Sequence, residues 1–172
     1  RDRGTVKPTP QIKSTTYNSI TVNWGAVPGA SKYAIATRES NGSYKTYTLD
    51  CTGTSYTING LASNTSYQIL VQANINGKWS SFSANDCITG KTVVDKTRPA
   101  PVIASTGDGT VTLKWDAVEG ASKYAIAEYI DGSYKTYTLD CKDTSYTVSN
   151  LANGYKHTFL VQANINGRWS SF

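Results

Sequence analysis

Residues 29–36 read Gly-Ala-Ser-Lys-Tyr-Ala-Ile-Ala, and the same eight residues return unchanged at 120–127. Two other stretches also occur twice: residues 42–51 (GSYKTYTLDC) return at 132–141, and residues 70–77 (LVQANING) return at 160–167. The copies lie 91 residues apart for the first pair and 90 residues apart for the other two. Self-similarity at a fixed period indicates two copies of one folding unit, although a length of 172 residues alone suggests a single domain.

The spacing between the copies falls by one residue where residues 38–42 (RESNG) face residues 129–132 (YIDG). A hairpin loop loses a residue without disturbing the strands on either side of it. We therefore expect a hairpin loop at this point in both copies.

Each copy has the alternating pattern of β-strands and no helical period. Ile20, Val22 and Trp24 alternate with polar residues, which predicts a strand with one apolar face. Turn residues separate the strands predicted for the first copy, which are residues 11–13, 20–24, 33–35, 44–49, 56–58, 67–75 and 79–88. Seven short strands at this spacing predict an antiparallel sandwich of two sheets.

On these residues each copy resembles a fibronectin type III domain. The residues that carry the resemblance are Trp24, Tyr33, Ile35, Leu61, Tyr67, Val71, Ala73, Asn76 and Gly77, in this order and spacing. The resemblance implies an all-β chain of two immunoglobulin-like, seven-stranded β-sandwiches in tandem. It places the domains at residues 8–92 and 98–172, joined by a linker at 93–97, and leaves the second domain without most of its last strand.

The resemblance also implies a role for Tyr67, the residue whose hydroxyl returns to the backbone in the family's tyrosine corner. At the equivalent position the second copy has His157, the only histidine of the chain. We therefore expect the corner bond of the second copy to be altered or to be made by the imidazole.

Composition excludes several classes of function. The formal charge is +5, but the basic residues stand singly among Ser, Thr and Tyr, so we expect no nucleic-acid partner. Apolar runs such as residues 33–36 are far shorter than the roughly 18 residues that cross a bilayer, so we expect no membrane insertion.

Catalytic and metal-binding patterns are also missing from the sequence. His157 has no nucleophile in a recognisable context, and Asp50 and Asp140 are isolated carboxylates near turns. We expect no catalytic residues, no cofactor and no metal.

The expected topology separates Cys51 from Cys87 by roughly 25 Å. A disulfide needs Cα atoms within about 7 Å, so a bridge requires a departure from that topology. Whether Cys51, Cys87 and Cys141 are bridged stays open at this point.

One surface is a candidate for ligand or partner binding. Ala34, Ala36 and Leu70 point away from the core in the expected strands, and Trp79 begins the neighbouring strand. The candidate residues are Trp79, Tyr44 and Tyr47, with Trp169, Tyr134 and Tyr137 as their counterparts. Such a face stacks a sugar ring or receives a protein partner, unless Trp79 simply covers its own sheet.

Residues 79–83 (WSSFS) also resemble the W-S-x-W-S box of cytokine receptors, with Phe in place of the second Trp. That box works with arginines on the sixth strand, where this chain has Gln68, Gln72 and Asn74. A receptor ectodomain further implies glycosylation at Asn41 or Asn64. This resemblance is the weaker of the two.

Together these observations predict a non-catalytic spacer or adhesion module. Near-identical neighbouring copies favour a segment of a larger secreted or cell-surface protein, of the kind found in bacteria. The expected partners are neighbouring domains of that protein and a glycan or host surface protein. The alternatives are a carbohydrate-binding module that uses the aromatic face and a cytokine-receptor-like ectodomain fragment.

Overall fold

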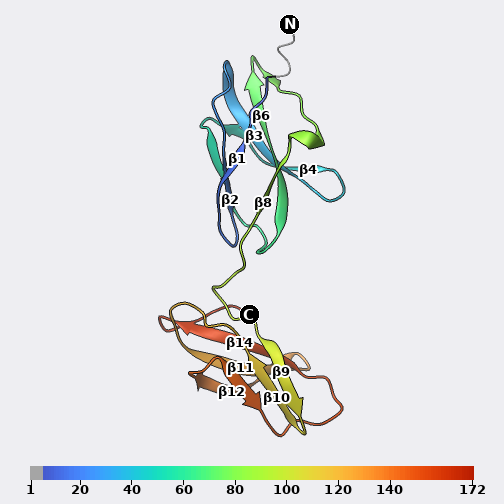
Figure 1. Cartoon of the computed structure of the whole chain (residues 1–172), viewed down its shortest axis with the longest axis vertical. Helices are drawn as coiled ribbons and strands as arrows, with labels where there is room; N and C mark the ends of the chain where they lie inside the picture. The colour runs from blue at the N-terminus through green and yellow to red at the C-terminus, as the bar shows by residue number, and fades with distance from the viewer. Residues whose placement is uncertain (1–5) are drawn as a thin grey trace. The chain divides into compact units, whose positions relative to one another are not determined.

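The computed structural model describes residues 6–172 and divides the chain between Asp95 and Lys96 into two units (Figure 1). The backbone of Val93 still belongs to the first unit, because its N–H donates to Thr16 and its carbonyl accepts from Asn64. The first domain therefore extends to Val93, one residue into the segment predicted as linker.

The first domain is a sandwich of two antiparallel sheets. Its strands are β1 (Gln11–Thr15), β2 (Ile20–Asn23), β3 (Ala30–Arg38), β4 (Tyr44–Cys51), β5 (Ser55–Ile58), β6 (Ser66–Ile75), β7 (Lys78–Trp79) and β8 (Ile88–Lys91). One sheet has the order β1-β2-β5, and the other has the order β4-β3-β6-β7, with β8 also paired to β6. The hairpin expected near residues 38–42 is the connection between β3 and β4.

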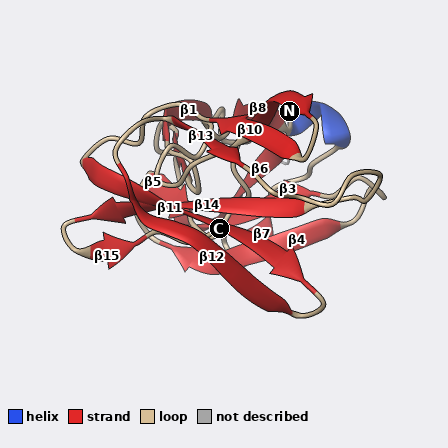
Figure 2. Cartoon of the chain, turned by 90° about the horizontal axis from the view of Figure 1, so that it is seen from below, coloured by secondary structure: helices blue, strands red, loops and turns tan. Residues whose placement is uncertain are grey.

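The strand predicted at residues 79–88 is not continuous, and this prediction is wrong. Two short strands replace it, β7 and β8, and a 3₁₀ helix, η1 (Ala84–Asp86), lies between them (Figure 2, blue). The carboxylate of Asp86 accepts the N–H of Ser83 at 2.7 Å and lies 3.0 Å from Lys7 Nζ. These local bonds favour a turn over an extended chain.

The second domain repeats this arrangement. Its strands are β9 (Val102–Gly107), β10 (Thr110–Lys114), β11 (Ala121–Ile130), β12 (Ser133–Cys141), β13 (Ser145–Val148), β14 (Thr158–Ile165) and β15 (Arg168–Trp169). The sheet orders are β13-β10-β9 and β12-β11-β14-β15. Among residues 6–172 no strand corresponds to β8 here.

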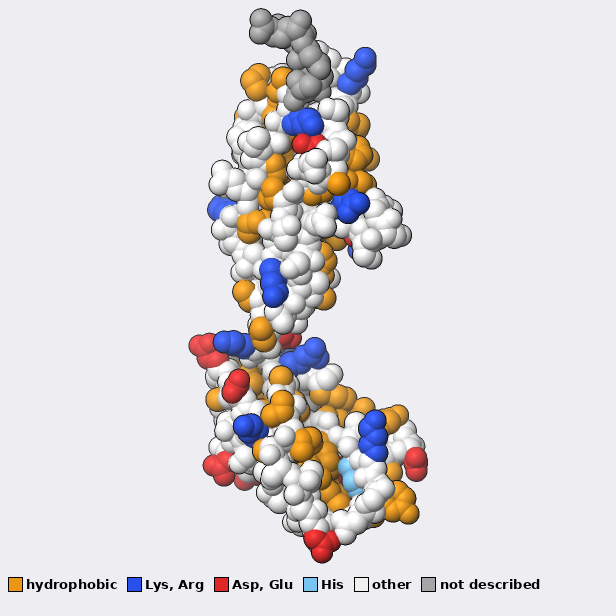
Figure 3. Space-filling model, turned by 45° about the vertical axis from the view of Figure 1, so that its right-hand side comes forward, with side chains coloured by type: hydrophobic (Ala, Val, Ile, Leu, Met, Phe, Trp, Pro, Cys, Tyr) orange, Lys and Arg blue, Asp and Glu red, His pale blue; other side chains and the backbone are white. Residues whose placement is uncertain are grey.

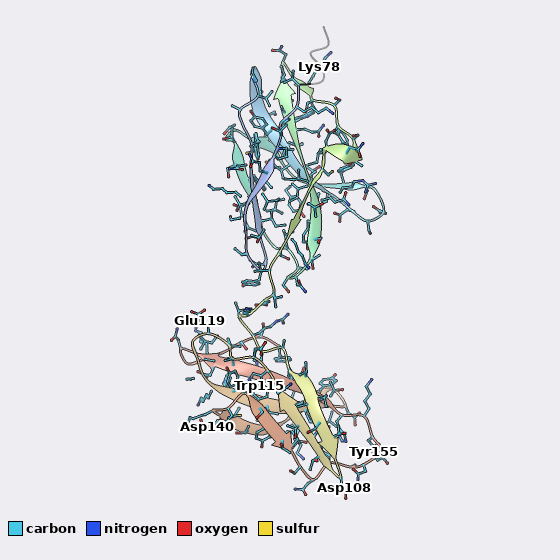
Figure 4. All side chains as sticks on the ribbon, viewed as in Figure 1. Lys78, Asp108, Trp115, Glu119, Asp140 and Tyr155 are labelled. Atoms are coloured by element: carbon cyan, nitrogen blue, oxygen red, sulfur yellow. The ribbon has the colours of Figure 1, made fainter. Side chains whose placement is uncertain are left out.

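Each sandwich has its own core between its sheets, built around one tryptophan. Trp24 and Trp115 are each 5% exposed, and Figure 4 labels Trp115 inside the second domain. Trp24 meets Tyr33 edge to face at 5.2 Å between ring centres, and Trp115 meets Tyr124 in the same way at 5.3 Å. Equivalent tryptophans in equivalent surroundings confirm the predicted all-β tandem fold.

The strands account for the regular structure of residues 6–172 apart from η1 (Figure 2). Over the same residues, no helix is both long enough and apolar enough to cross a bilayer.

Candidate functional site

Trp79 lies on the outer face of its sheet, beside a lysine. The backbone of Asn74 on β6 pairs with Trp79 on one side and with Lys32 of β3 on the other. Lys32 Nζ lies 5.9 Å from the centre of the Trp79 ring and 3.1 Å from Asp50 Oδ1. A cation at this distance from an indole ring is attracted to the ring face.

The second domain places Lys123 Nζ 5.9 Å from the Trp169 ring, so the lysine–tryptophan contact occurs twice. Asp140, the counterpart of Asp50, lies 3.5 Å from Lys142. In the W-S-x-W-S box of cytokine receptors, the cation beside the tryptophan comes from the sixth strand. Here the cation is a lysine of the third strand. The side-chain amide of Gln72, on β6, donates to the carbonyl of Ser80 at 2.8 Å.

The apolar face predicted beside Trp79 is already covered by the chain itself. Ala34, Ala36 and Leu70 point outward but are only 5%, 8% and 2% exposed. The segment after β7 crosses this face, because the Phe82 ring lies 5.2 Å from the Tyr44 ring on β4, at the opposite edge of the sheet. The structure therefore brings Tyr44 together with Phe82 and leaves no open apolar trough.

Tyr47 and Tyr137 lie on the other side of the sheet from Trp79 and Trp169. Both pack against the core of their own domain. The Tyr47 hydroxyl lies 3.5 Å from Thr37 Oγ1. They were predicted as surface residues, but the structure does not bring them to the outer face.

Tyr134 belongs to a cluster of exposed aromatic rings in the second domain. Its ring centre lies 5.2 Å from that of Tyr129 and 5.4 Å from that of Phe172. Tyr129 is 46% exposed, Tyr134 is 51% exposed and Phe172 is 59% exposed. They line a groove of about 470 Å³ together with Pro99, Pro101 and residues 158–161.

A cluster of three polar side chains was not predicted from the sequence, although an imidazole bond at this corner was. It joins His157, Glu128 and Tyr137 in the second domain. His157 Nδ1 lies 2.6 Å from Glu128 Oε2, and the Tyr137 hydroxyl donates to Glu128 Oε1 at 2.6 Å. His157 Nε2 lies 3.0 Å from the carbonyl oxygen of Ala152. Glu128 is 4% exposed, so it is a buried carboxylate with both oxygens bonded.

The geometry of this cluster favours a charged imidazole. Both ring nitrogens of His157 face acceptors, a carbonyl and a carboxylate, and only the protonated ring has two N–H donors. The Ala152 carbonyl and then Glu128 raise the pKa of His157. Figure 3 shows the imidazole, in pale blue, at the surface of the second domain.

The pKa values of Glu128 and Tyr137, the two side chains in this cluster with His157, are shifted as well. Burial alone would raise the pKa of Glu128, but the bonds from Tyr137 and His157 outweigh it and lower that pKa. Burial, followed by the bond to Glu128, raises the pKa of Tyr137 to about 12. The cluster is a closed ion pair with a phenol, in which every group has a partner within the domain.

The corresponding corner of the first domain uses different residues. The N–H of Ala62 donates to the Tyr67 hydroxyl at 2.8 Å, so the tyrosine corner implied by the family resemblance is present. Thr92 Oγ1 donates to the Ala62 carbonyl at 2.6 Å. In the second domain His157, which stands where Tyr67 does, bonds the carbonyl of Ala152, the counterpart of Ala62.

The three cysteines are unbridged. Cys51 ends β4, and its thiol lies 3.6 Å from the carbonyl oxygen of Ser55. Cys87 instead lies near Tyr44, at the start of β4, and burial raises the pKa of its thiol. The length of β4 therefore separates the two sulfurs, as the expected topology predicts. Residues 6–172 contain no group of three metal-ligating side chains.

Comparison with known proteins identifies relatives of this chain. Residues 6–85 match the model of the family described as "Fibronectin type III domain". The mouse protein "Fibronectin type III domain-containing protein 7" is 29% identical over 160 residues, which are 91% of this chain and 21% of that protein. Human "Receptor-type tyrosine-protein phosphatase H" is 27% identical over 169 residues, 94% of this chain and 14% of that protein.

A bacterial relative is "Amylopullulanase" of Thermoanaerobacterium saccharolyticum, 30% identical over 67 residues, 38% of this chain and 5% of that protein. The chain thus spans about a fifth of the length of the mouse relative. Among solved structures, a two-domain segment of chicken tenascin covers 96% of this chain and 95% of its own, with 18% identity and a TM-score of 0.49. An Fn3-like protein from Clostridium thermocellum covers 45% of this chain and 84% of its own, with 30% identity and a TM-score of 0.40.

Proposed function

Residues 6–85 belong to the fibronectin type III family, and from this premise we propose that the chain is a non-catalytic spacer within a longer extracellular protein. Its work is geometric: two folded sandwiches add length and hold neighbouring modules apart. The partners we propose are therefore the adjoining domains of the same protein.

One observation supports this proposal above the others: the outer face of the larger sheet is covered by its own chain. In the first domain the segment that carries Phe82 covers Ala34 and Ala36. In the second domain the counterparts Ala125 and Ala127 are 5% and 7% exposed, and Phe172 lies against Tyr134 as Phe82 lies against Tyr44. The alanines of this face are thus covered in both domains, which supports a role in folding for the face.

The setting of the relatives supports an extracellular module in a large protein. The chain matches short parts of a receptor-type phosphatase and of a bacterial amylopullulanase. We propose a similar modular setting in a bacterial secreted or surface protein. Adhesion to a host surface is the finer form of this proposal.

A distance measurement tests the spacer directly. The ten residues of β6 extend over about 33 Å, so each sandwich adds length on this order. We expect fluorescence energy transfer between dyes at residues 6 and 95 to report a separation of about 30 Å, because Val93 is bonded to Thr16, at the end of β1 away from residue 6. A much shorter separation contradicts the spacer.

A carbohydrate-binding module remains the second candidate because Trp169 keeps 37% of its surface exposed beside Lys123. A glycan array separates the two functions. Binding that is lost in Trp169→Ala, with the fold intact by circular dichroism, favours the carbohydrate module. If the native chain binds no glycan on the array, the result favours the spacer. Trp79→Ala is the matched variant in the first domain.

A further inference from the structure

A pocket of about 580 Å³ lies at the cluster of His157, Glu128 and Tyr137. Its walls are the hairpin that β11 and β12 form and, facing it, residues 150–152 and 155–157. The pocket lies on the side of β14 that carries β11 and β12, whereas in the first domain β8 pairs with the opposite edge of β6. Volumes of about 300–1,000 Å³ are typical of small-molecule sites, so this pocket has room for a small ligand.

Sequence differences between the two copies gather at this pocket. Eight of its twelve lining residues differ from their counterparts in the first copy, whereas residues 120–127 and 160–167 repeat theirs without a change. The four lining residues that are kept are Lys135, Tyr137, Leu151 and Ala152. The second copy thus retains the strands of the sandwich and changes the pocket.

The exchanges place an aliphatic and an aromatic side chain at the rim. Ile130 stands where the first copy has Glu39, and Tyr155 stands where it has Thr65. Ile130 is 41% exposed, and Tyr155, which Figure 4 labels, is 74% exposed. Side chains this exposed add little to the core, and apolar surface at the rim of a pocket is typical of a binding site. A phenol ring offers a flat face on which a sugar ring packs.

Lysines give the pocket a positive charge. His157 and Glu128 form an ion pair at 2.6 Å, so together they add no net charge. Lys135 and Lys156 line the same pocket, and neither forms an ion pair with a carboxylate of residues 6–172. Apart from Glu128, Asp131 is the one carboxylate among the lining residues. Two lysines against one carboxylate favour an anionic ligand.

We propose that this pocket binds a carboxylate-bearing sugar, whose ring packs on Tyr155 and whose carboxylate lies between Lys135 and Lys156. The first domain has Thr65 and Ser66 in the places of Tyr155 and Lys156, so the site exists once in the chain. This binding function goes beyond the spacer and uses a surface other than the outer face of Trp169.

A titration followed by ¹H–¹⁵N NMR on the full chain tests the site. The probe is a linear trimer of galacturonic acid at neutral pH, where its carboxyls are ionised. Its methyl ester is the matched control, because it keeps the sugar rings and removes their charges. We expect saturable shifts at residues 128–131 and 150–157, binding of the ester at least about tenfold more weakly, and unchanged resonances in the first domain.

Two variants restore the residues of the first domain and so remain compatible with the fold. Tyr155→Thr and Lys156→Ser are each expected to weaken binding at least about tenfold. Lys142→Thr, which restores Thr52 outside the pocket, is the matched control for a lost charge and leaves binding unchanged.

Four results overturn the proposal. They are the absence of saturable shifts, equal binding of the acid and its ester, native affinity in both pocket variants, and an equal loss in Lys142→Thr. Binding that Trp169→Ala abolishes and Tyr155→Thr leaves intact also overturns it, because the sugar then lies on the outer face of the sheet.

Discussion

The imidazole of His157 forms hydrogen bonds to two acceptors, and these bonds favour its charged form. A carbonyl and a buried carboxylate face its two nitrogens, so the charged imidazole is the form that satisfies both. The first domain has Thr37 where the second has Glu128, and it has Tyr67 where the second has His157. Two exchanged residues thus convert a tyrosine corner into an ion pair.

The stability of the second domain therefore depends on pH. Folding raises the pKa of His157, so its contribution is complete below about pH 6.5 and is lost as the pH rises through the folded value. Folding lowers the pKa of Glu128, so its contribution is present above about pH 4.5 and is lost as the pH falls through the folded value. We expect maximal stability between these limits.

Urea denaturation followed by ¹H–¹⁵N NMR measures this dependence for each domain separately. The midpoint of the second domain is expected to fall as the pH rises from about 6 to about 8.5. The first domain, which has no histidine, is the control. If the urea midpoint falls equally in both domains, or falls by the same amount in the His157→Gln variant, the pH dependence does not come from His157.

Tyr67→Phe tests the corner of the first domain. The substitution removes the acceptor of the Ala62 N–H and leaves the ring, so we expect a loss of about 1 kcal/mol in the free energy of unfolding of that domain. Chemical denaturation measures it. Tyr17→Phe, at a half-buried phenol, serves as the control, and equal midpoints for the two variants contradict the role given to the Tyr67 hydroxyl.

At the scale of elements, the decisive feature is the path of the chain after β7. It crosses the outer face of the sheet, forms η1 beside Lys7, and returns to β6 as β8. β8 then contacts both sheets of the sandwich through β6 and β1. Closure of the first domain depends on this last strand.

Gly90→Ala tests how tightly β8 closes the sandwich. The added Cβ lies 2.8 Å from Ile12 Cδ1 and 3.3 Å from Ile20, so we expect the first domain to lose about 1–3 kcal/mol of stability. Gly53→Ala is the matched control, since a Cβ there has nothing within 4 Å. Thermal unfolding compares the two, and a Gly90→Ala variant as stable as Gly53→Ala refutes the close packing of β8.

The alternation of apolar residues was enough to predict most of the strands and the apolar face that each one buries. It did not predict the break between β7 and β8, which depends on hydrogen bonds that Asp86 accepts from Ser83 and Lys7. It also placed Tyr47 on the outer face, although this side chain packs against the core. The bonds of Glu128 reach a residue 29 positions away, so periodicity gave no sign of them. Alignment of the two copies does show Thr37 exchanged for Glu128, and that exchange was the available signal.

At the scale of the whole molecule, the repeat produces two domains with separate cores. The same residues occupy the same places in each, as Ile35 and Ile126 show, both completely buried. The domains differ at the corner, where the first has the bond of Tyr67 and the second has the ion pair of His157. A spacer requires that each domain holds its own fold.

A matched pair of core variants, Ile35→Ala and Ile126→Ala, tests this independence most directly. Urea unfolding of the full chain is followed by ¹H–¹⁵N NMR, with resonances of each domain read separately. Ile35→Ala is expected to destabilise the first domain alone by about 2–5 kcal/mol, and Ile126→Ala the second domain alone by a similar amount. If either variant shifts the unfolding midpoints of both domains together, the two sandwiches are one cooperative unit and the account is wrong.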